Sequence, residues 1–315
     1  MSRPIPVEQM LKEFKSFNKT SHLFKIDNFS LLKKYNLKMV ESSVFDLGGH
    51  KWKLILYPNE NGYVSIFLVN QVSINAKLQF QLFVIKQIQK IWHSTGLSLS
   101  LSLSLSHPCS CVICVGKEDF GISSISQKRG ASYFISLADL EKKGYLIEDC
   151  CIFGVKLFGT ENAKSGTAEC FSLIEKPLNH RVTFEMASYS ILTLGVKVHY
   201  STEFVVGNRK WRIEVHPKGF DWEEDKSFSV YLLGQGFIDN ALKTNTFAKF
   251  KLRVLDQVNK DHLEKTYSDW ISAEHVDHYG FADFMPLKKL NLPYLMNDVL
   301  YVGIDFEVIS TSNYC

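Results

Sequence analysis

One segment of the chain has the residue types and the spacing of a metal site. His107, Cys109, Cys111 and Cys114 lie close together, and thiolate and imidazole groups at such spacings are typical zinc ligands. A closed zinc site usually takes its four ligands from two separate pairs, and no second paired half accompanies this one. We therefore expect no metal ion here.

Two further pairs could act as nucleophiles or ligands. Cys150 and Cys151 are adjacent in a predicted strand, so their side chains point to opposite faces, and we expect one thiol in the core and the other at the surface. His275 and His278 lie three residues apart in a polar segment, where imidazoles are expected to be solvated rather than metal-bound. Neither pair predicts a catalytic site.

Motifs for phosphate and nucleotide binding are incomplete. Asp119-Phe-Gly121 has the letters of the kinase magnesium motif, but no glycine-rich phosphate loop accompanies it. Gly234-Gln-Gly236 lacks the third glycine of a dinucleotide fingerprint, and there is no G-x-S-x-G nucleophile motif. We therefore expect no catalytic residue, no cofactor and no enzymatic activity.

The composition argues against a nucleic-acid or membrane partner. The 315 residues carry a net charge of +3 without a run of five basic residues, whereas a phosphate backbone demands a basic stripe. No window of eighteen apolar residues could cross a bilayer, and the charged N-terminus is not a secretory signal. Seven cysteines, an odd count, fit free thiols in a reducing compartment, so we expect a cytoplasmic or nuclear protein.

The elements that must position any site come from an internal repeat. The segment FDLGGHKWKLILYP aligns without a gap with FVVGNRKWRIEVHP, which begins at Phe204. Two later blocks repeat in the same order: FISLADL with FMPLKKL, and YLIEDCCIFG with YLMNDVLYVG. The sequence therefore predicts a tail over 1–20, one domain over 21–160, a linker over 161–180 and a second domain over 181–310.

Each copy has the pattern of an antiparallel β-sandwich. Seven or eight strand-length segments per copy are separated by turn residues, and a short helical turn follows FISLADL and its repeat. Trp52 and Trp211 occupy the same position of a strand that alternates apolar and polar residues, so we expect both rings in the core. The predicted fold class is all-β, with two tandem sandwiches.

The first copy carries an insertion relative to the second. Phe80 and Phe134 are 54 positions apart, whereas the matching Phe250 and Phe284 are 34 apart. Residues 95–116, which include the LSLSLSLSLS tract, account for the excess of about twenty residues. A CT dinucleotide repeat encodes Leu-Ser in every forward frame, so a retained intron is our preferred explanation and a genuine expressed loop is the alternative.

Together these segments resemble the MATH domain, the TRAF-type β-sandwich. The resemblance rests on FKIDNFS near the start, the G-x-x-K-W strand, SVYL, KFKLRVL, the aromatic-Gly-Phe pair and the late GYLIED and YLMND segments. It covers both copies, and two-copy chains of this kind resemble a plant group. The resemblance implies a groove on each sandwich that binds an extended peptide by β-augmentation.

The positions that the resemblance implies for peptide binding are aromatic in the second copy. They are Tyr231, Phe250, Trp270, Tyr279 and Phe281, of which Trp270 needs one residue of slack in the alignment. Aromatic side chains suit this role because they give a large contact area at low entropic cost.

The first copy keeps only half of this set. It has Phe67 and Phe80 at the first two positions, but Arg129 and Ala131 replace Tyr279 and Phe281. We therefore expect the first copy to bind weakly or differently, or to serve only as a structural partner.

The sequence thus predicts a monomeric, non-enzymatic adaptor that recognises a linear peptide segment of a partner protein. The resemblance also implies a connection to the ubiquitin pathway. Two alternatives remain: a fragment or relative of a MATH-containing ubiquitin-specific cysteine protease, and a carbohydrate-binding sandwich that uses aromatic platforms.

Overall fold

The computed structural model describes most of the chain and divides it into two compact units. The described residues are 21–71, 77–87, 112–121, 128–158, 166–195, 197–239 and 241–315. The first unit comprises 1–172 together with 312–315, and the second comprises 173–311. The expected N-terminal tail and the Leu-Ser tract lie outside the described residues, whereas the end of the expected insertion belongs to a strand, Val112–Gly121.

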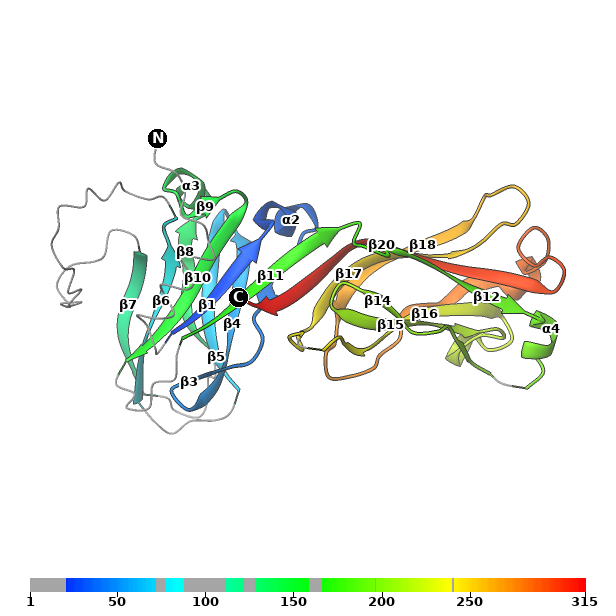
Figure 1. Cartoon of the computed structure of the whole chain (residues 1–315), viewed down its shortest axis with the longest axis horizontal. Coiled ribbons are helices and arrows are strands. Elements are labelled where there is room, and N and C mark those ends of the chain that lie inside the picture. The colour runs from blue at the N-terminus through cyan, green and yellow to red at the C-terminus, as the bar shows by residue number, and fades with distance from the viewer. Residues whose placement is uncertain are drawn as a thin grey trace. The chain divides into compact units, whose positions relative to one another are not determined.

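The first unit contains two β-sheets (Figure 1). One sheet consists of β2 (Val40–Glu41), β3 (Phe45–Leu47), β4 (His50–Glu60), β5 (Tyr63–Asn70) and β8 (Lys128–Ser136). The other runs in the order β11 (Thr167–Glu175), β1 (Ser21–Asp27), β10 (Cys150–Phe158), β6 (Lys77–Ile85) and β7 (Val112–Gly121), with β9 (Leu146–Ile147) beside β10. Helices α2 (Phe29–Lys34) and α3 (Leu137–Lys142) lie between strands in the chain.

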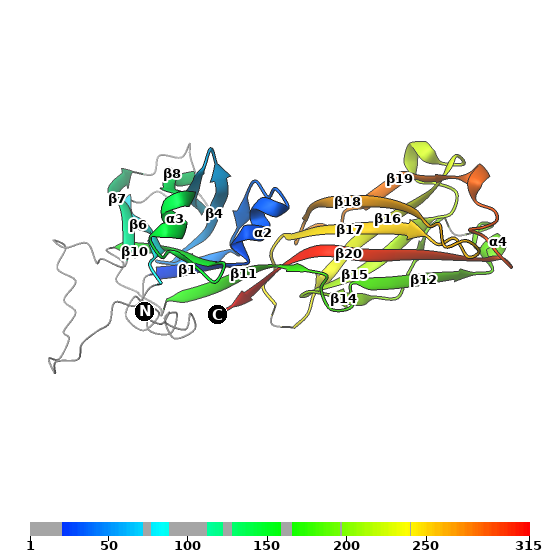
Figure 2. The ribbon, with the colours of Figure 1, turned by 90° about the horizontal axis from the view of Figure 1, so that it is seen from above.

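The second unit repeats this plan. One sheet contains β13 (His199–Tyr200), β14 (Phe204–Val206), β15 (Arg209–His216), β16 (Ser227–Phe237) and β19 (Tyr279–Pro286). The strands of the other, which run side by side in Figure 2, are β18 (Leu263–Ile271), β17 (Thr246–Val254), β20 (Val299–Tyr314) and β12 (Arg181–Ala187). The short helices are α4 (Tyr189–Leu192), η1 (Asp221–Glu223) and η2 (Leu287–Lys289). Both units confirm the predicted all-β sandwich class.

The repeated tryptophan anchors both cores, as the sequence predicts. Trp52 is 3% exposed and Trp211 is 0% exposed. Each indole N–H donates to a backbone carbonyl five residues earlier, Leu47 in one unit (2.9 Å) and Val206 in the other (3.1 Å). A buried indole N–H needs such an acceptor, so this hydrogen bond holds the segment before the turn against the tryptophan strand.

A second repeated contact joins the start of each domain to its end. The Asp149 carboxylate accepts from the backbone N–H (2.8 Å) and the hydroxyl (2.7 Å) of Ser30 at the start of α2. Asp298 makes the same two contacts with Ser190 at α4. This carboxylate caps the first turn of the helix, which explains why aspartate occurs in both YLIED and YLMND.

The adjacent cysteines differ from the sequence-based expectation. Both are buried, Cys150 at 6% and Cys151 at 0% exposure, so the prediction of one surface thiol is wrong. The reason is that the outer face of β10 is also covered: Cys150 lies in a second apolar cluster with Leu23, Phe83 and Ile152.

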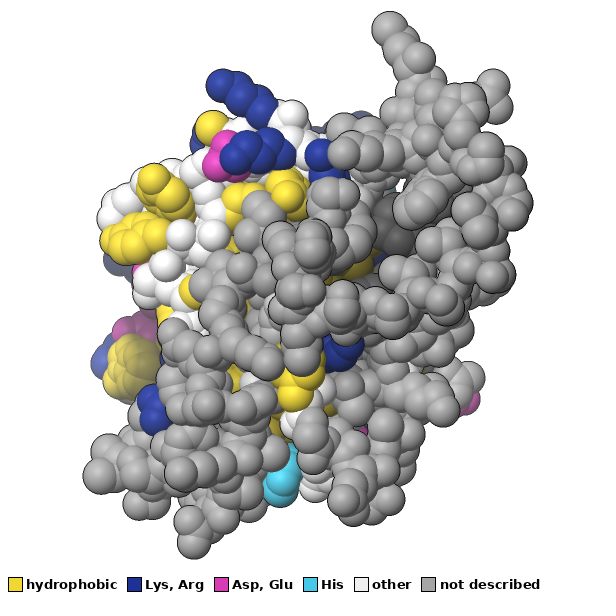
Figure 3. Space-filling model, turned by 90° about the vertical axis from the view of Figure 1, so that its left-hand side faces the viewer, with side chains coloured by type: hydrophobic (Ala, Val, Ile, Leu, Met, Phe, Trp, Pro, Cys, Tyr) yellow, Lys and Arg dark blue, Asp and Glu magenta, His cyan; other side chains and the backbone are white. Residues whose placement is uncertain are grey.

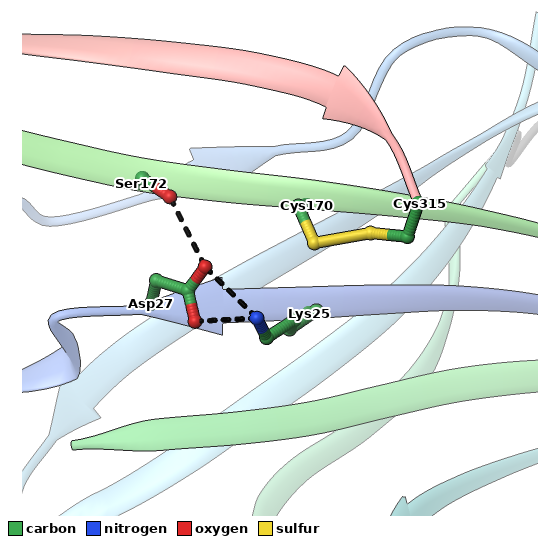
Figure 4. Close-up of a disulfide and its surroundings, with 5 residues drawn as sticks. All are labelled: Lys25, Asp27, Cys170, Ser172 and Cys315. Carbon is green, nitrogen blue, oxygen red and sulfur yellow. Dashed lines mark hydrogen bonds and ion pairs between the residues drawn. A yellow bond between two sulfur atoms is a disulfide. The ribbon is translucent and has the colours of Figure 1, made fainter. Parts of the chain in front are cut away.

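Two other cysteines form a disulfide, which corrects the expectation of free thiols for this pair. Cys170 on β11 and Cys315, after the end of β20, are joined within the first unit, with their Cα atoms 5.9 Å apart (Figure 4). The Cys315 backbone N–H also donates to the Ala168 carbonyl at 3.0 Å. On the neighbouring strand, Asp27 binds Lys25 and accepts from the Ser172 hydroxyl (Figure 4).

A buried carboxylate lies near this disulfide in the sequence. Glu169 is 0% exposed and accepts from the Ser43 backbone N–H (2.8 Å) and hydroxyl (2.6 Å). Burial raises the pKa of Glu169 to about 7, and the hydrogen bonds from Ser43 and Ser312 counteract only part of that effect. The carboxyl therefore holds its proton more tightly in the folded first unit than in the unfolded chain.

The disulfide predicts a specific pattern in peptide mapping. Under non-reducing digestion we expect a linked peptide that contains Cys170 and Cys315, whereas Cys150 and Cys151 resist alkylation until the protein is unfolded, because both thiols are buried. Because the bridge closes a loop of 145 residues, its loss in Cys170→Ser should destabilise the first unit by on the order of 5 kcal/mol in the chain-entropy model. Free Cys170 and Cys315 in protein purified without reductant would contradict this assignment.

Glu169 predicts a pH dependence of stability. Because its folded pKa is about 7 and its ordinary value is 4.5, the folded state binds more protons between these values, and the free energy of unfolding falls as pH rises through this window. The difference is on the order of 3 kcal/mol. Thermal unfolding from pH 4.5 to 8 should show a shallower decline in Glu169→Gln, whose side chain is neutral throughout. Equal declines in both proteins would contradict the assignment.

Candidate functional site

The five aromatic positions expected to bind peptide lie on four strands of the second unit. Tyr231 is on β16, Phe250 on β17, Trp270 on β18, and Tyr279 and Phe281 are on β19. Among the described strands, β19 pairs only with β16 and β18 pairs only with β17, so each is an edge strand of its own sheet.

Three of the five lie together with a residue that the sequence analysis missed. The ring centroid of Tyr267 on β18 lies 6.4 Å from that of Tyr279, 5.7 Å from that of Phe281 and 5.7 Å from that of Phe250. We call these four residues the β18–β19 aromatic cluster. Tyr279 and Phe281 pair in register with the core residues Leu232 and Val230, so their rings lie on the same face of the sheet as the core. On that face they meet Tyr267, and the cluster joins the two edge strands across the open side of the sandwich.

The four rings of this cluster differ in exposure. Phe250 is fully buried (0%), so it supports Tyr267 from below and offers no surface to a ligand. Tyr279 is 7% exposed, whereas Tyr267 and Phe281 are half-buried. The Lys265 ammonium lies 5.1 Å from the centre of the Phe281 ring, which adds a cation beside the aromatic surface.

Trp270 is not part of the cluster. It is the register partner of Phe247, and the two ring centroids are 5.7 Å apart. Side chains alternate along a strand, so Trp270 and Tyr267, three positions apart, point to opposite faces of β18. The cluster therefore contains Tyr267 and not Trp270, in agreement with the alternation of half-buried and exposed residues along β18.

A glycine determines how closely β19 approaches its neighbour. Gly280 lies opposite Tyr231, and a Cβ atom on Gly280 would stand 2.3 Å from the Val230 carbonyl oxygen and 2.8 Å from the Tyr231 Cα. Gly130 occupies the same place in the first unit, where a Cβ atom would stand 2.2 Å from the Ile66 carbonyl oxygen. No side chain fits there without displacing backbone, which explains the aromatic-Gly-Phe spacing.

Tyr231 lies on the opposite face of its sheet from Tyr279 and Phe281. Its ring packs at 5.4–6.0 Å between centroids against His216, Phe220 and His278. Beneath them is Glu214, 1% exposed, whose Oε1 atom is 2.7 Å from His216 Nε2 and 2.8 Å from His278 Nδ1. We call these five residues the Glu214 cluster.

The electrostatics of the Glu214 cluster are those of an ion-paired carboxylate. Burial alone would raise the pKa of Glu214, but the hydrogen bonds and charges of His216 and His278 outweigh it, so this pKa lies below its ordinary value. His278 is exposed, as the sequence predicts for a solvated imidazole, and it also forms an ion pair with the Glu214 carboxylate. Among the described residues, no group of three or more Cys, His, Asp or Glu side chains could hold a metal ion.

The first unit carries different side chains at the matching positions. Arg129 and Ala131 on β8 pair with Leu68 and Ile66, as Tyr279 and Phe281 pair with Leu232 and Val230. On the outer face of this sheet, the Lys128 ammonium lies 4.0 Å from the Phe67 ring centre. One face of the first unit, with hydrophobic, basic and acidic side chains intermingled, is shown in Figure 3. Phe80 is buried at 7%.

Within the described part of the chain, no helix has the length and apolar character needed to span a membrane.

Neither of the adjacent cysteines Cys150 and Cys151 has the properties of a reactive thiol. Burial raises the pKa of Cys150 to about 12 and that of Cys151 well above its ordinary value, whereas a nucleophilic cysteine needs a lowered pKa.

Comparisons with known proteins agree on one family. The MATH domain family model matches residues 21–157 and again 181–306. Ubiquitin C-terminal hydrolase 13 of Arabidopsis thaliana is 31% identical over 144 residues, which make up 44% of this chain and 12% of the hydrolase. A MATH domain and coiled-coil domain-containing protein of the same plant is 30% identical over 141 residues, 42% of each chain.

The chain thus spans about an eighth of the hydrolase and about two-fifths of the coiled-coil relative. Among solved structures, TRAF5 of Notothenia coriiceps is 18% identical with a TM-score of 0.36, over 41% of this chain and 73% of that one. Because the family model matches two segments that together cover most of the residues, the chain belongs to the MATH domain family and carries the domain twice.

Proposed function

We propose that the second MATH domain binds short, extended peptide segments of partner proteins along the outer edge of β19. An edge strand presents unpaired backbone N–H and C=O groups, with which a peptide can pair as an additional strand. Among the described strands, only β16 is hydrogen-bonded to β19, which leaves the other edge for a ligand. MATH domains are protein-interaction modules, which supports this role.

The observation that carries the proposal is the β18–β19 aromatic cluster beside that edge. A peptide paired with β19 would direct alternate side chains toward Tyr267 and Phe281, which are both half-buried. The Tyr267 ring rests on the buried ring of Phe250, and the Phe281 ring packs against Tyr267. Desolvated aromatic side chains of this kind supply most of the binding energy in many interfaces. The site would therefore favour peptides with a small or apolar anchor next to residues that form good strands.

The first domain has a different role in this proposal. With Arg129 and Ala131 at the positions of Tyr279 and Phe281, it has neither of those two rings on β8. It would bind the same peptides weakly or serve to present the second domain.

The ubiquitin connection rests on similarity alone. The match to the Arabidopsis ubiquitin hydrolases covers only a small part of those proteins, so the similarity extends to the interaction module and not to their whole length. We propose a non-enzymatic adaptor that acts on partners in this pathway through binding, in a monomeric state. The buried, high-pKa thiols of Cys150 and Cys151 support this choice over the cysteine-protease alternative.

The proposal predicts that binding depends on the aromatic cluster. Peptides selected from a random library on the full chain should lose at least tenfold in affinity with Phe281→Ala or Tyr267→Ala, because each variant removes a half-buried ring. The control is Trp222→Ala, which removes an aromatic side chain of the same domain that is 69% exposed and lies on η1. Titration calorimetry measures the affinities, and circular dichroism verifies folding.

A second arm tests the backbone pairing. Methylating alternate amide nitrogens of the selected peptide should weaken binding strongly in one register and little in the other, because only one set of N–H groups faces β19. Unchanged affinity in both aromatic variants, or a loss confined to Trp222→Ala, would place the binding surface elsewhere. A glycan array that yields ligands where the peptide library yields none would favour the carbohydrate-binding alternative.

A further inference from the structure

A buried arginine without an acidic partner lies next to the aromatic cluster. Arg209, the first residue of β15, is 2% exposed. Its Nη1 atom donates to the Ile271 carbonyl (3.0 Å) and to the Thr246 hydroxyl (3.3 Å), and its Nη2 atom donates to the Ser272 carbonyl. Within the described residues, Nε has no hydrogen-bond partner, and the acceptors of the two Nη atoms are all neutral.

A glycine and two aromatic rings surround the Arg209 side chain. A Cβ atom on Gly234 would stand 2.2 Å from Arg209 Nη2, so glycine is required for the guanidinium to lie across β16. Two aromatic rings flank the group, with the guanidinium carbon 5.1 Å from the Trp211 ring centre and 5.0 Å from that of Phe237. Burial lowers the pKa of Arg209 to about 10, so its confinement has an energetic cost that neutral acceptors and ring faces offset only in part.

The carbonyls that Arg209 binds belong to the end of β18. At this point the chain leaves β18 and returns through a turn to β19. The Ser272 backbone N–H donates to the Tyr279 hydroxyl at 2.9 Å, and the Ser272 hydroxyl accepts from the backbone N–H groups of Glu274 (3.2 Å) and His275 (3.1 Å). A continuous chain of contacts therefore runs from Arg209 through Ser272 to the Tyr279 ring.

The first domain carries other residues at the positions of Arg209, Gly234 and Tyr279. His50 takes the register position of Arg209, Asn70 that of Gly234, and Arg129 that of Tyr279. The sandwich of the first domain forms with this different set, so neither the arginine nor its glycine is a general requirement of the fold. In the second domain, the hydrogen bonds of Ser272 with the Arg209 guanidinium and the Tyr279 hydroxyl link these two residues.

We infer that Arg209 is a positioning residue of the peptide-binding edge, which holds the end of β18 and, through Ser272, sets the position of Tyr279 relative to Tyr267. The inference rests on the proposed function, because it assigns the purpose of this placement to peptide binding. Arg209 itself is buried and does not touch the ligand. A lysine would keep the charge, but its donors all lie on one nitrogen and cannot reproduce the planar fork with which Nη1 and Nη2 reach Ile271 and Ser272.

A double-mutant cycle on peptide affinity tests the inference. In the full chain, with the tightest library-selected peptide as probe, Arg209→Met and Tyr279→Phe should each weaken binding about tenfold. The double variant should be no weaker than either single variant, because both changes interrupt the same chain of contacts. Lys210→Met, at the half-buried neighbouring position, is the matched control and should bind as wild type does. Losses that multiply in the double variant, or full affinity in folded Arg209→Met, would overturn the inference.

A second readout does not depend on peptide binding. Fluorine NMR of the full chain labelled with 3-fluorotyrosine reports each ring, and Tyr279→Phe and Tyr267→Phe assign the two resonances. Arg209→Lys, which retains the charge, should shift the Tyr279 signal and leave that of the exposed Tyr314 unchanged. If wild type binds no peptide but the Tyr279 signal shifts, the proposed function fails and the positioning stands. An unshifted Tyr279 signal in folded Arg209→Lys and Arg209→Met rejects the positioning even where peptide binds.

Discussion

The close approach of β19 to β16 over Gly280 is the constraint on which the candidate site depends. Because a Cβ atom at this position would overlap the Val230 carbonyl, only glycine lets the edge strand lie flat against Tyr231. This contact fixes the register that turns Tyr279 and Phe281 toward the open side of the sandwich and Tyr231 toward the opposite face. Tyr267 then completes the aromatic surface from the other sheet.

Both MATH domains share this constraint but use it differently. Gly130 holds β8 against β5 as Gly280 holds β19 against β16. On the edge so formed, the first domain carries a cation and a methyl group, Arg129 and Ala131, whereas the second carries two aromatic rings. Below the edge, the second domain adds a buried guanidinium, Arg209, that has no counterpart in the first. The fold is therefore common to both copies, whereas the pair of aromatic rings at these two positions is particular to the second.

The sequence was sufficient for the fold, but not for the full set of residues that form the β18–β19 aromatic cluster. The repeat and the alternation around Trp52 and Trp211 predict two sandwiches with tryptophan-anchored cores, and both rings are buried. Tyr279 and Phe281 follow from the aromatic-Gly-Phe spacing, a local signal. Tyr267 was missed because its role depends on which face of β18 meets β19, a relation between two sheets.

Other differences have the same origin. Phe250 was expected at the binding surface but is fully buried. It lies on an inner strand, and the residues that cover it can be identified only once the packing of the two sheets is known. The bridge between Cys170 and Cys315 joins residues 145 positions apart, a distance over which cysteine spacing carries no signal. The partners of Arg209 likewise lie on segments far from it in the sequence.

Amide hydrogen exchange can locate a bound peptide on the chain without any substitution, so it is the sharpest test of peptide pairing along β19. We expect a library-selected peptide to slow exchange in Tyr279–Pro286 and, to a smaller extent, in Leu263–Ile271, since the ligand pairs with β19 and covers the aromatic cluster. Protection confined to the outer face around β13 and β15, or to β8 of the first domain, would contradict it.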